Sequence, residues 1–402
     1  MRSAELNVEK LVYGGDGLAR LEGQAVLVPF VLPSERVSAS LTSANPGLLR
    51  GTPLQILQPA AQRIVPRCEY FGDCGGCQYQ HAEYGFQLEQ KQAILRETLR
   101  RLGGIDYDRE IHVIAGEPWF YRNRIQLHFE ERQSGFHRAG SRALCAVERC
   151  YISSPVLVDV IAKLQTAVKQ PQWPGFLRSL EFFTNESQIQ VNVLDSARPV
   201  AARFFEWLRA ILPNLAPGSI EYDTARHKFQ ISRGAFFQVN RFLIDALIDE
   251  VIGDRSGSQA VDLYAGVGLF TLPLATRFKS VHAVERGGPA FHDLEHNASR
   301  VASHIAITRQ SAEQFLSSLT EPPDLIIADP PRAGLGKNAT RELLRIQPYT
   351  LTLVSCDPAT LARDLRKLLS AYRIARMTLI DLFPQTYHFE TVVHLQRAAT
   401  EP

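Results

Sequence analysis

The sequence predicts an α/β protein with three parts: a small antiparallel barrel, a mixed α+β segment, and an open parallel sheet covered by helices on both faces. Residues 221–402 alternate short apolar runs with helical patterns, which is typical of a parallel sheet. Residues 1–57 hold weakly alternating runs between glycine and proline turns. The length of 402 residues exceeds that of a typical single domain. We therefore predict three domains, covering 1–57, 58–220 and 221–402.

The composition indicates a globular protein with an ordinary core. A formal net charge of +2 is too small to indicate nucleic acid binding by itself, so any basic surface must be local. No apolar run reaches the roughly 18 residues that a membrane helix needs. The start, MRSAELNVEKLVYGGDG, is charged where a signal peptide requires an apolar run. We therefore expect a cytoplasmic monomer without membrane contact, whose clustered cysteines bind metal or do chemistry rather than form disulfides.

The elements of the first two segments follow from local patterns. The stretch QAVLVPFVLPSERVSASLT alternates weakly, with turns at residues 14–17 and 33–34. Residues 84–102 predict a helix whose apolar face consists of Leu88, Leu95, Leu99 and Leu102. The other expected elements are strands at 124–129 and 189–194 and helices at 155–168 and 201–212.

The third segment predicts five strands of one sheet. Their apolar runs are 260–264, 280–285, 306–308, 324–328 and 351–355. Residues 379–397 add a further pair of strands, joined by the stretch FPQT. Ligands of open parallel sheets bind at the carboxyl ends of the strands, so the residues that follow these runs are candidate site residues.

A glycine turn follows the first of these strands. In AVDLYAGVGLFTLPLA the strand leads to Gly266 and Gly268 and then to a helix from about Leu269. The next strand ends at Glu285, at a spacing that suits a carboxylate binding a ribose diol. A dinucleotide site would have a third glycine where this chain has Thr271. The turn therefore favours a nucleoside-type cofactor such as S-adenosylmethionine over NAD; the alternative is a purely structural turn.

A rigid loop follows the fourth strand. The stretch LIIADPPRAGL places Asp329 at the carboxyl edge of the sheet, followed by two prolines and Arg332. The prolines hold an extended loop that lacks two backbone donors. A glycine turn, Glu285 and Asp329 at separate strand ends form a more specific combination than any one of them alone.

Cys356 ends the fifth strand, in the stretch LTLVSCDPATLARDL, and we expect it to face the same edge. By itself it fits a small packing residue, a metal ligand or a nucleophile, since free cysteines are often buried. Glu390 follows the FPQT turn and offers a carboxylate base beside a thiol nucleophile. His388 fits a structural or orienting role better than that of a base. The combination favours covalent catalysis by Cys356 with Glu390 as the base.

Four motifs carry a resemblance to a known family. In chain order they read DLYAGVGLFTL, ADPPRAGL, VSCDPATLARDL and FPQTYHFE, and they resemble the RNA 5-methyluridine methyltransferases over nearly the whole chain. The resemblance implies a Rossmann-like class I methyltransferase domain that uses S-adenosylmethionine to methylate C5 of a uridine. The cofactor-binding residues that it implies, together with the glycine of the turn, are Gln238, Tyr264, Gly266, Glu285 and Asp329.

The same resemblance implies a covalent route. Cys356 adds to C6 of the target uracil, C5 of the resulting enolate attacks the methyl group, and Glu390 removes the C5 proton so that the thiolate leaves. Addition at C6 comes first because C5 of uracil is a poor nucleophile until it becomes enolate-like. Asp329 is then expected near the target base as well as near the cofactor.

A separate group of cysteines lies in the stretch CEYFGDCGGCQYQH and in VERCYIS. Its candidate metal ligands are Cys68, Cys74, Cys77 and either Cys150 or Cys145. The spacing fits zinc or a [4Fe–4S] cluster, although a symmetric zinc ribbon would show two Cys-x-x-Cys pairs. The resemblance favours the [4Fe–4S] cluster with Cys150 as the fourth ligand, where Tyr151 replaces the usual proline. The cluster's expected role is structural or in RNA handling, because methyl transfer requires no redox step.

The expected substrate is RNA. Residues 1–57 resemble the small RNA-binding barrel called the TRAM domain, with Ser34 where that barrel usually has glycine. Such barrels bind RNA through basic and aromatic residues; the alternative is a spacer. Barrel and cluster together resemble the ribosomal RNA branch of the family, which implies a flipped-out uridine of 23S rRNA, with tRNA as the alternative. Candidate phosphate contacts are Arg122, Arg124, Arg363, Arg366 and Lys367.

Three rival functions are the alternatives to this one. An amino-group methyltransferase would have an aromatic residue after Asp-Pro-Pro, where this chain has Arg332, and would not need Cys356. A 5-methylcytidine enzyme would have a second cysteine in that loop, and the sequence has none there. The third rival is an iron–sulfur RNA-binding module without methylation activity.

Overall fold

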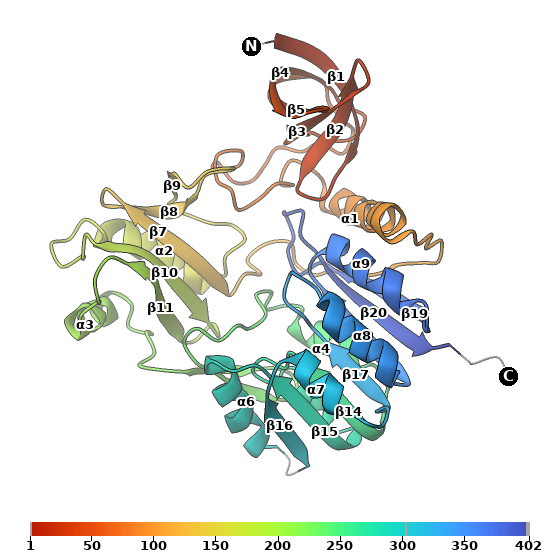
Figure 1. Cartoon of the computed structure of the whole chain (residues 1–402). Helices are drawn as coiled ribbons and strands as arrows, with labels where there is room; N and C mark the ends of the chain where they lie inside the picture. Colours follow the sequence, from red (N-terminus) through yellow and green to blue (C-terminus); the bar gives the residue numbers. More distant parts are fainter. Residues whose placement is uncertain (1, 302–303, 399–402) are drawn as a thin grey trace.

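The computed structural model describes residues 2–301 and 304–398, which form three lobes. Figure 1 shows a small barrel at the top, a second lobe at the left and a large sheet with its helices at the lower right. In the described ranges, no helix is long and apolar enough to cross a membrane.

The first lobe is a closed barrel, as predicted. Its strands pair in the order β1-β2-β3-β5-β4. They are β1 (Arg2–Leu11), β2 (Asp16–Leu21), β3 (Gln24–Pro29), β4 (Arg36–Asn45) and β5 (Leu48–Gln58). Alternate side chains such as Val26, Val28 and Val37 fill the interior without exposure to solvent. The side chain of Leu11, at the end of β1, instead packs into the core of the large sheet.

The second lobe is a five-stranded antiparallel sheet in the order β11-β10-β7-β8-β9, with two helices. Its strands are β7 (Arg124–Glu130), β8 (Gln133–His137), β9 (Leu144–Ala146), β10 (Leu177–Thr184) and β11 (Ile189–Ser196). Its helices are α2 (Pro155–Ala167) and α3 (Ala202–Ile211). The two strands and two helices predicted here are confirmed, with small differences at their ends.

The large sheet has eight strands in the order β16-β15-β14-β17-β18-β20-β19-β6. The parallel strands β14 (Gly257–Leu263), β15 (Phe278–Glu285), β16 (Ile305–Arg309), β17 (Leu325–Ala328) and β18 (Thr350–Ser355) confirm the five predicted ones. The predicted further pair is β19 (Tyr372–Ile380) and β20 (Glu390–Arg397), and β20 runs antiparallel to both β18 and β19. A hairpin, β12 (Ile220–Asp223) and β13 (Lys228–Ile231), precedes the sheet.

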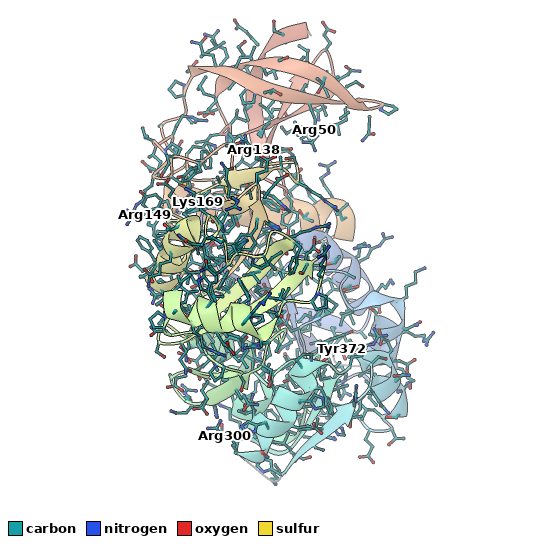
Figure 2. All side chains as sticks on the ribbon, turned by 90° about the vertical axis from the view of Figure 1, so that its left-hand side faces the viewer. Arg50, Arg138, Arg149, Lys169, Arg300 and Tyr372 are labelled. Carbon is teal, nitrogen blue, oxygen red and sulfur yellow. The ribbon has the colours of Figure 1, made fainter. Side chains whose placement is uncertain are left out.

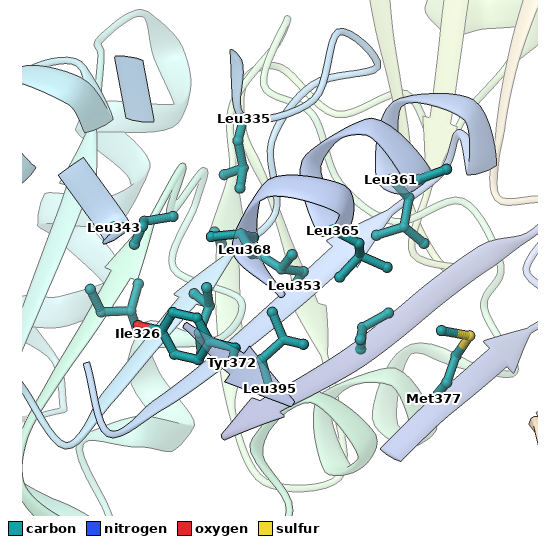
Figure 3. Close-up of a cluster of buried hydrophobic side chains, with 14 of the residues drawn as sticks. Ile326, Leu335, Leu343, Leu353, Leu361, Leu365, Leu368, Tyr372, Met377 and Leu395 are labelled. Carbon is teal, nitrogen blue, oxygen red and sulfur yellow. The ribbon is translucent and has the colours of Figure 1, made fainter. Parts of the chain in front are cut away.

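Helices cover both faces of this sheet, as predicted. They are α4 (Ile244–Ile252), α5 (Thr271–Leu274), α6 (Pro289–Ser299), α7 (Ala312–Ser318), α8 (Gly336–Ile346) and α9 (Pro358–Leu368). On one face, leucines of α8 and α9 pack on Ile326, Leu353 and Leu395 (Figure 3). On the other face, α4 and α5 pack on Ala260 and Ile327. The helix expected from about Leu269 is shorter than predicted, since only residues 271–274 are helical.

Residues 84–114 precede the second lobe in the chain but pack on the large sheet. They form α1 (Tyr84–Thr98), a π-helical turn η1 (Leu99–Gly103) and β6 (His112–Ile114), which pairs with β19. In Figure 1, α1 lies beside α9. The predicted apolar face is wrong at Leu102, which is 48% exposed. A π turn holds more residues than an α turn, so residues beyond Leu99 rotate away from the face that regular spacing defines.

Candidate active site

The sheet order brings Cys356, Asp329 and Glu390 to one edge. Asp329 directly follows β17, Cys356 directly follows β18, and the two strands are parallel neighbours. Glu390 is the first residue of β20, which runs antiparallel beside β18. The end of one strand and the beginning of its antiparallel neighbour meet at the same edge. Three predicted residues that lie far apart in the sequence are therefore neighbours at this edge.

The thiol of Cys356 is half-buried between a strand and a helix. The strand β18 ends at Ser355, and α9 begins at Pro358. Asp357 caps this helix, since its Oδ1 accepts hydrogen bonds from the backbone N–H groups of Ala359 and Thr360, both at 2.9 Å. The cap and the strand fix the backbone on both sides of Cys356.

The electrostatics of this edge favour protonated groups in the free protein. Burial, and then the charge of Glu390, raises the pKa of the Cys356 thiol to about 11, while Arg332 acts in the opposite direction. Burial raises the pKa of Asp329 to about 7. Burial, and then the neighbouring Asp329, raises the pKa of Glu390 well above its usual range. A carboxyl group whose pKa is near 7 exists in both protonation states at neutral pH and can accept or donate a proton, so the site is suited to moving protons to and from a sulfur or carbon atom.

A tyrosine from the barrel, which was not among the predicted site residues, also contacts the site. The hydroxyl of Tyr13, in the turn after β1, donates a hydrogen bond to the backbone carbonyl of Cys356 at 3.0 Å. The same hydroxyl lies 3.5 Å from Nδ1 of His388, and the Tyr13 ring makes edge contacts with Tyr387 and Phe389. Burial, and then Arg332, lowers the pKa of His388 to about 4, so this imidazole is neutral at physiological pH.

The glycine turn after β14 has the geometry of a ligand cradle. Tyr264, Gly266 and Gly268 have positive φ angles of 60°, 57° and 95°. A Cβ atom built at Gly266 meets no heavy atom within 4 Å, which leaves open space beside the backbone. The Oε2 atom of Glu285 accepts a hydrogen bond from the Gly266 N–H at 2.9 Å. The glycine turn and the carboxylate of Glu285, which were predicted separately, are therefore in direct contact.

Below the turn, the buried Asp262 keeps one carboxylate oxygen without a partner among the described residues. Its Oδ2 accepts a hydrogen bond from the Thr271 hydroxyl at 2.5 Å, whereas Oδ1 has none. Burial raises the pKa of Asp262 to about 7. Gln238 is buried in the loop between β13 and α4, and its backbone carbonyl accepts a hydrogen bond from Asn123 at 3.1 Å. Among the described hydrogen bonds, none joins the Gln238 side chain to the glycine turn. The open cradle with a free buried acceptor fits a polar, nucleoside-sized ligand.

Four of the predicted cysteine ligands line one cavity of about 230 Å³, namely Cys68, Cys74, Cys77 and Cys150. Burial, together with the nearby thiols, raises the pKa of Cys74 to about 12. The competitor Cys145 is absent from the lining, and its Sγ lies 3.4 Å from Oδ2 of Asp73. Within the described ranges, no three His, Cys, Asp or Glu side chains are arranged to hold a metal ion.

Of the five candidate phosphate contacts, two are buried or half-buried and three are exposed. Arg124 is wrong as an RNA contact, because it is buried, pairs with Glu181 at 2.8 Å and lies over the ring of Phe183. Arg122 is half-buried and lines the cysteine cavity. Arg363, Arg366 and Lys367 are exposed on α9, the helix that begins just after Cys356. A basic residue in a strand with alternating burial can face the core, which residue type alone does not reveal.

Comparison with known proteins places this geometry in a family. Residues 219–398 match the model of the family described as tRNA (Uracil-5-)-methyltransferase, and residues 3–54 match the TRAM domain. The chain is 31% identical to an uncharacterized RNA methyltransferase of Aquifex aeolicus, over 98% of both chains. It is 30% identical to the 23S rRNA (uracil(1939)-C(5))-methyltransferase RlmD of Salmonella typhimurium, over 95% of this chain and 94% of that one.

A solved structure shares the fold over the whole chain. The tRNA (uracil-54, C5)-methyltransferase of Pyrococcus abyssi, in complex with S-adenosyl-L-homocysteine, superposes with a TM-score of 0.74. The match covers 97% of this chain and 100% of that one, at 23% sequence identity. At this level of identity the likeness establishes the three-lobed fold.

Proposed function

The chain belongs to the family of RNA (uracil-5-)-methyltransferases, and we propose that it methylates C5 of a uridine in 23S rRNA through a covalent adduct between Cys356 and the base. The observation that carries this proposal is the meeting of one thiol and two carboxylates at the edge of the sheet. Cys356 provides the nucleophile, Glu390 the base, and Asp329 a second carboxylate beside both.

The first step is addition of Cys356 to C6 of the uracil. At neutral pH the thiol carries its proton, because its pKa is raised to about 11. The proton therefore passes to the Asp329 carboxylate as the bond between sulfur and C6 forms, which leaves the Glu390 carboxylate to accept the C5 proton later. The π electrons of the C5–C6 double bond move toward the O4 oxygen, which makes C5 nucleophilic. The hydrogen bond from Tyr13 to the Cys356 carbonyl holds the backbone of the nucleophile during this step.

When bound, S-adenosylmethionine would supply the methyl group that C5 of the adduct accepts. The residues proposed to hold it are Gln238, Tyr264, Gly266, Glu285 and Asp329. The contact between Gly266 and Glu285 supports this assignment, because it places a carboxylate at the mouth of an open backbone turn.

Glu390 completes the reaction by accepting the proton from C5. The C5–H electrons then re-form the C5–C6 double bond, and the bond between C6 and sulfur breaks, which releases Cys356 as the thiolate. The strand pairing between Ile380 and Glu390 fixes the backbone of the base. A raised pKa makes the ionised Glu390 a stronger base than an exposed carboxylate.

Ribosomal RNA is the proposed substrate rather than tRNA. The relative from Salmonella, whose name specifies 23S rRNA, matches at 30% identity over nearly the full length. Basic side chains of the barrel and the second lobe offer phosphate contacts: Figure 2 shows Arg50 of the barrel above Arg138, Arg149 and Lys169. The target uridine must leave its stack to reach the half-buried Cys356, which favours an unpaired region.

The cysteine cavity is proposed to hold a [4Fe–4S] cluster on Cys68, Cys74, Cys77 and Cys150. A single zinc ion would draw four sulfurs to within about 4 Å of one another, whereas a cluster holds them further apart. A cavity of about 230 Å³ lined by four thiols has room for the larger group. The Gly76 N–H also points to the sulfur of Cys74 at 3.5 Å, as N–H groups do around cluster sulfurs. When bound, the cluster would cross-link residues 68–77 to Cys150.

Two measurements test the proposed function. Mass mapping of methyluridines in ribosomal and transfer RNA, from a strain lacking the gene, identifies the substrate; the expected result is the loss of one 5-methyluridine from 23S rRNA. Transfer of labelled methyl groups in vitro should then be lost in Cys356→Ala and retained in Cys145→Ala, the control thiol. Full activity of Cys356→Ala would end the covalent proposal.

A further inference from the structure

The buried face of α1 contains two polar residues where an amphipathic helix would have apolar ones. Gln87 is 1% exposed and Lys91 is not exposed at all. They follow helical spacing with the buried Ile94 and Leu95 and therefore face the large sheet. Burying an amide and an ammonium group is unfavourable unless each finds partners, so their contacts show what this face of the helix does.

Lys91 forms an ion pair with Asp381, which is equally buried. The Lys91 Nζ atom lies 2.7 Å from Oδ1 of Asp381 and donates a second hydrogen bond to the carbonyl of Phe383 at 3.1 Å. The other oxygen of Asp381 accepts a hydrogen bond at 3.0 Å from the hydroxyl of Tyr84, which lies about two helical turns before Lys91. Tyr84 and Lys91 together hold Asp381 from α1.

Gln87 forms a reciprocal pair with Gln385. Its Nε2 donates to Oε1 of Gln385 at 3.0 Å, and its Oε1 accepts from the backbone N–H of Gln385 at 3.1 Å. The carbonyl of Gln385 accepts two further backbone hydrogen bonds, from Gln78 at 3.0 Å and Tyr79 at 2.9 Å. Gln385 has a φ angle of 68°, a conformation that a residue with a side chain holds only when its surroundings enforce it.

These contacts all end on residues 381–389, which we call the catalytic arch. The arch joins β19 to β20 and leads directly into Glu390. It also carries His388, whose ring lies beside Tyr13 and whose pKa Lys91 helps to lower. Beyond α1, the Tyr121 hydroxyl donates to the carbonyl of Pro384 at 3.1 Å. The arch is thus fixed by residues from outside the predicted catalytic segment.

We propose that Lys91 and Asp381 are positioning residues for catalysis: their ion pair sets the shape of the catalytic arch so that Glu390 and His388 face Cys356. This inference rests on the proposed function. Buried ion pairs contribute little net stability compared with apolar residues of similar size, so a pair at this place is better explained by the geometry it imposes. We therefore expect the loss of this ion pair to lower kcat while changing the free energy of unfolding little.

The same two strands offer a matched control near their middle, where Arg376 pairs with His394. Glu250 of α4 is 8% exposed, lies 3.0 Å from Arg376 of β19 and 3.2 Å from His394 of β20. This buried carboxylate braces β19 and β20 as Asp381 does, but away from the catalytic arch. If the double variant loses turnover only because the pairing of β19 with β20 is weakened, Glu250→Gln should lose turnover as well. If the loss comes from displacement of the catalytic arch, Glu250→Gln should keep its turnover.

The experiment compares the full-length wild type with Glu250→Gln, Gln87→Met and the double variant Lys91→Met with Asp381→Asn, which leaves no unpaired buried charge. Thermal unfolding, kcat and KM for RNA are measured for each. In addition, the rate of covalent adduct formation is measured with RNA carrying 5-fluorouridine, whose C5 fluorine cannot leave as a proton does. We expect the double variant to lose about tenfold or more in kcat with KM within about threefold, as for a residue that acts in the transition state.

The outcomes separate this proposal from the function on which it rests. A wild type that neither methylates RNA nor forms the adduct would refute the proposed function. An active wild type with equal turnover losses in the double variant and Glu250→Gln would overturn the positioning role alone. Gln87→Met adds no buried charge, so this variant should fold. We expect its loss of kcat to be smaller than that of the double variant, about threefold or more, because hydrogen bonds between neutral groups are weaker than an ion pair. Unchanged kcat in this variant and in the double variant would likewise refute the role.

Discussion

The chain contains two thiol sites that differ in what surrounds the sulfur. Cys356 stands alone among carboxylates, and the charge of Glu390 adds to burial in raising its pKa. In the cysteine cavity, the neighbours of Cys74 are other thiols and a backbone N–H group. Burial raises the thiol pKa at both places, so burial does not distinguish them. A single thiol beside carboxylates is suited to exchange protons, whereas several facing thiols are suited to share a cationic group.

Removing the carboxylate beside the lone thiol should give the largest effect. In Glu390→Gln the thiol proton can still pass to Asp329, so the adduct and methyl transfer can occur, but the carboxylate proposed to accept the C5 proton is gone. We expect turnover to fall by about a thousandfold, within the range for loss of a general base, and methylated RNA to accumulate on the protein. Denaturing electrophoresis with labelled RNA detects that complex. Turnover close to that of the wild type would show that another group is the base.

Removing one thiol from the cavity should sharpen the difference between the two sites. We expect Cys150→Ser, purified anaerobically, to lose most of the visible absorbance and bound iron, because one of four ligands is gone. Cys145→Ser should keep both, since Cys145 does not line the cavity. Iron analysis and the absorbance spectrum measure this. Iron that depends on Cys145 instead would reassign the fourth ligand.

The reactivity of Cys356 toward an alkylating reagent should depend on pH in an unusual range. Its pKa of about 11 means that only about 0.01% is thiolate at pH 7, and the fraction rises roughly tenfold per pH unit until about pH 11. Mass spectrometry of the free protein, after short exposure to iodoacetamide at several pH values, follows this site alone. A plateau near pH 8.5, the value of an ordinary thiol, would contradict the described electrostatics.

The smallest effect is expected from the barrel. Tyr13→Phe removes one hydrogen bond to the Cys356 carbonyl and retains the ring contacts with Tyr387 and Phe389. We expect kcat to fall by about three- to fivefold, as for the loss of a single hydrogen bond. The matched control is Tyr107→Phe, whose hydroxyl only contacts the exposed carbonyl of Glu110. Equal activity of both variants with the wild type would assign Tyr13 a packing role.

Much of the fold follows from local patterns. The strands of the large sheet could be predicted because each is a short apolar run, and the order of site residues along the chain matches the strand ends. The short length of helix α5, which covers only residues 271–274, could not be predicted, because the packing of the turn on neighbouring elements is not visible in the sequence. Leu102 was misassigned because regular helical spacing does not reveal a π turn.

The contacts between distant segments were the part that the sequence did not reveal. Tyr13 and Cys356 are 343 residues apart, and Lys91 and Asp381 are 290 residues apart. The other charged residues around Lys91 in its helix predict that it is exposed to solvent, and its burial is explained only by its partner Asp381. Such pairs arise from tertiary packing, which hydrophobic periodicity does not encode.

The turn that carries Tyr13 has a consequence for how the parts of this chain can be exchanged. A foreign barrel grafted in place of residues 2–58 would bring its own loop against His388 and the Cys356 carbonyl. The graft would change the groups that contact Cys356 and His388 together with the surface that we propose to bind RNA. Under the proposed function, a chimera made to alter the choice of RNA should therefore also alter the rate of methylation.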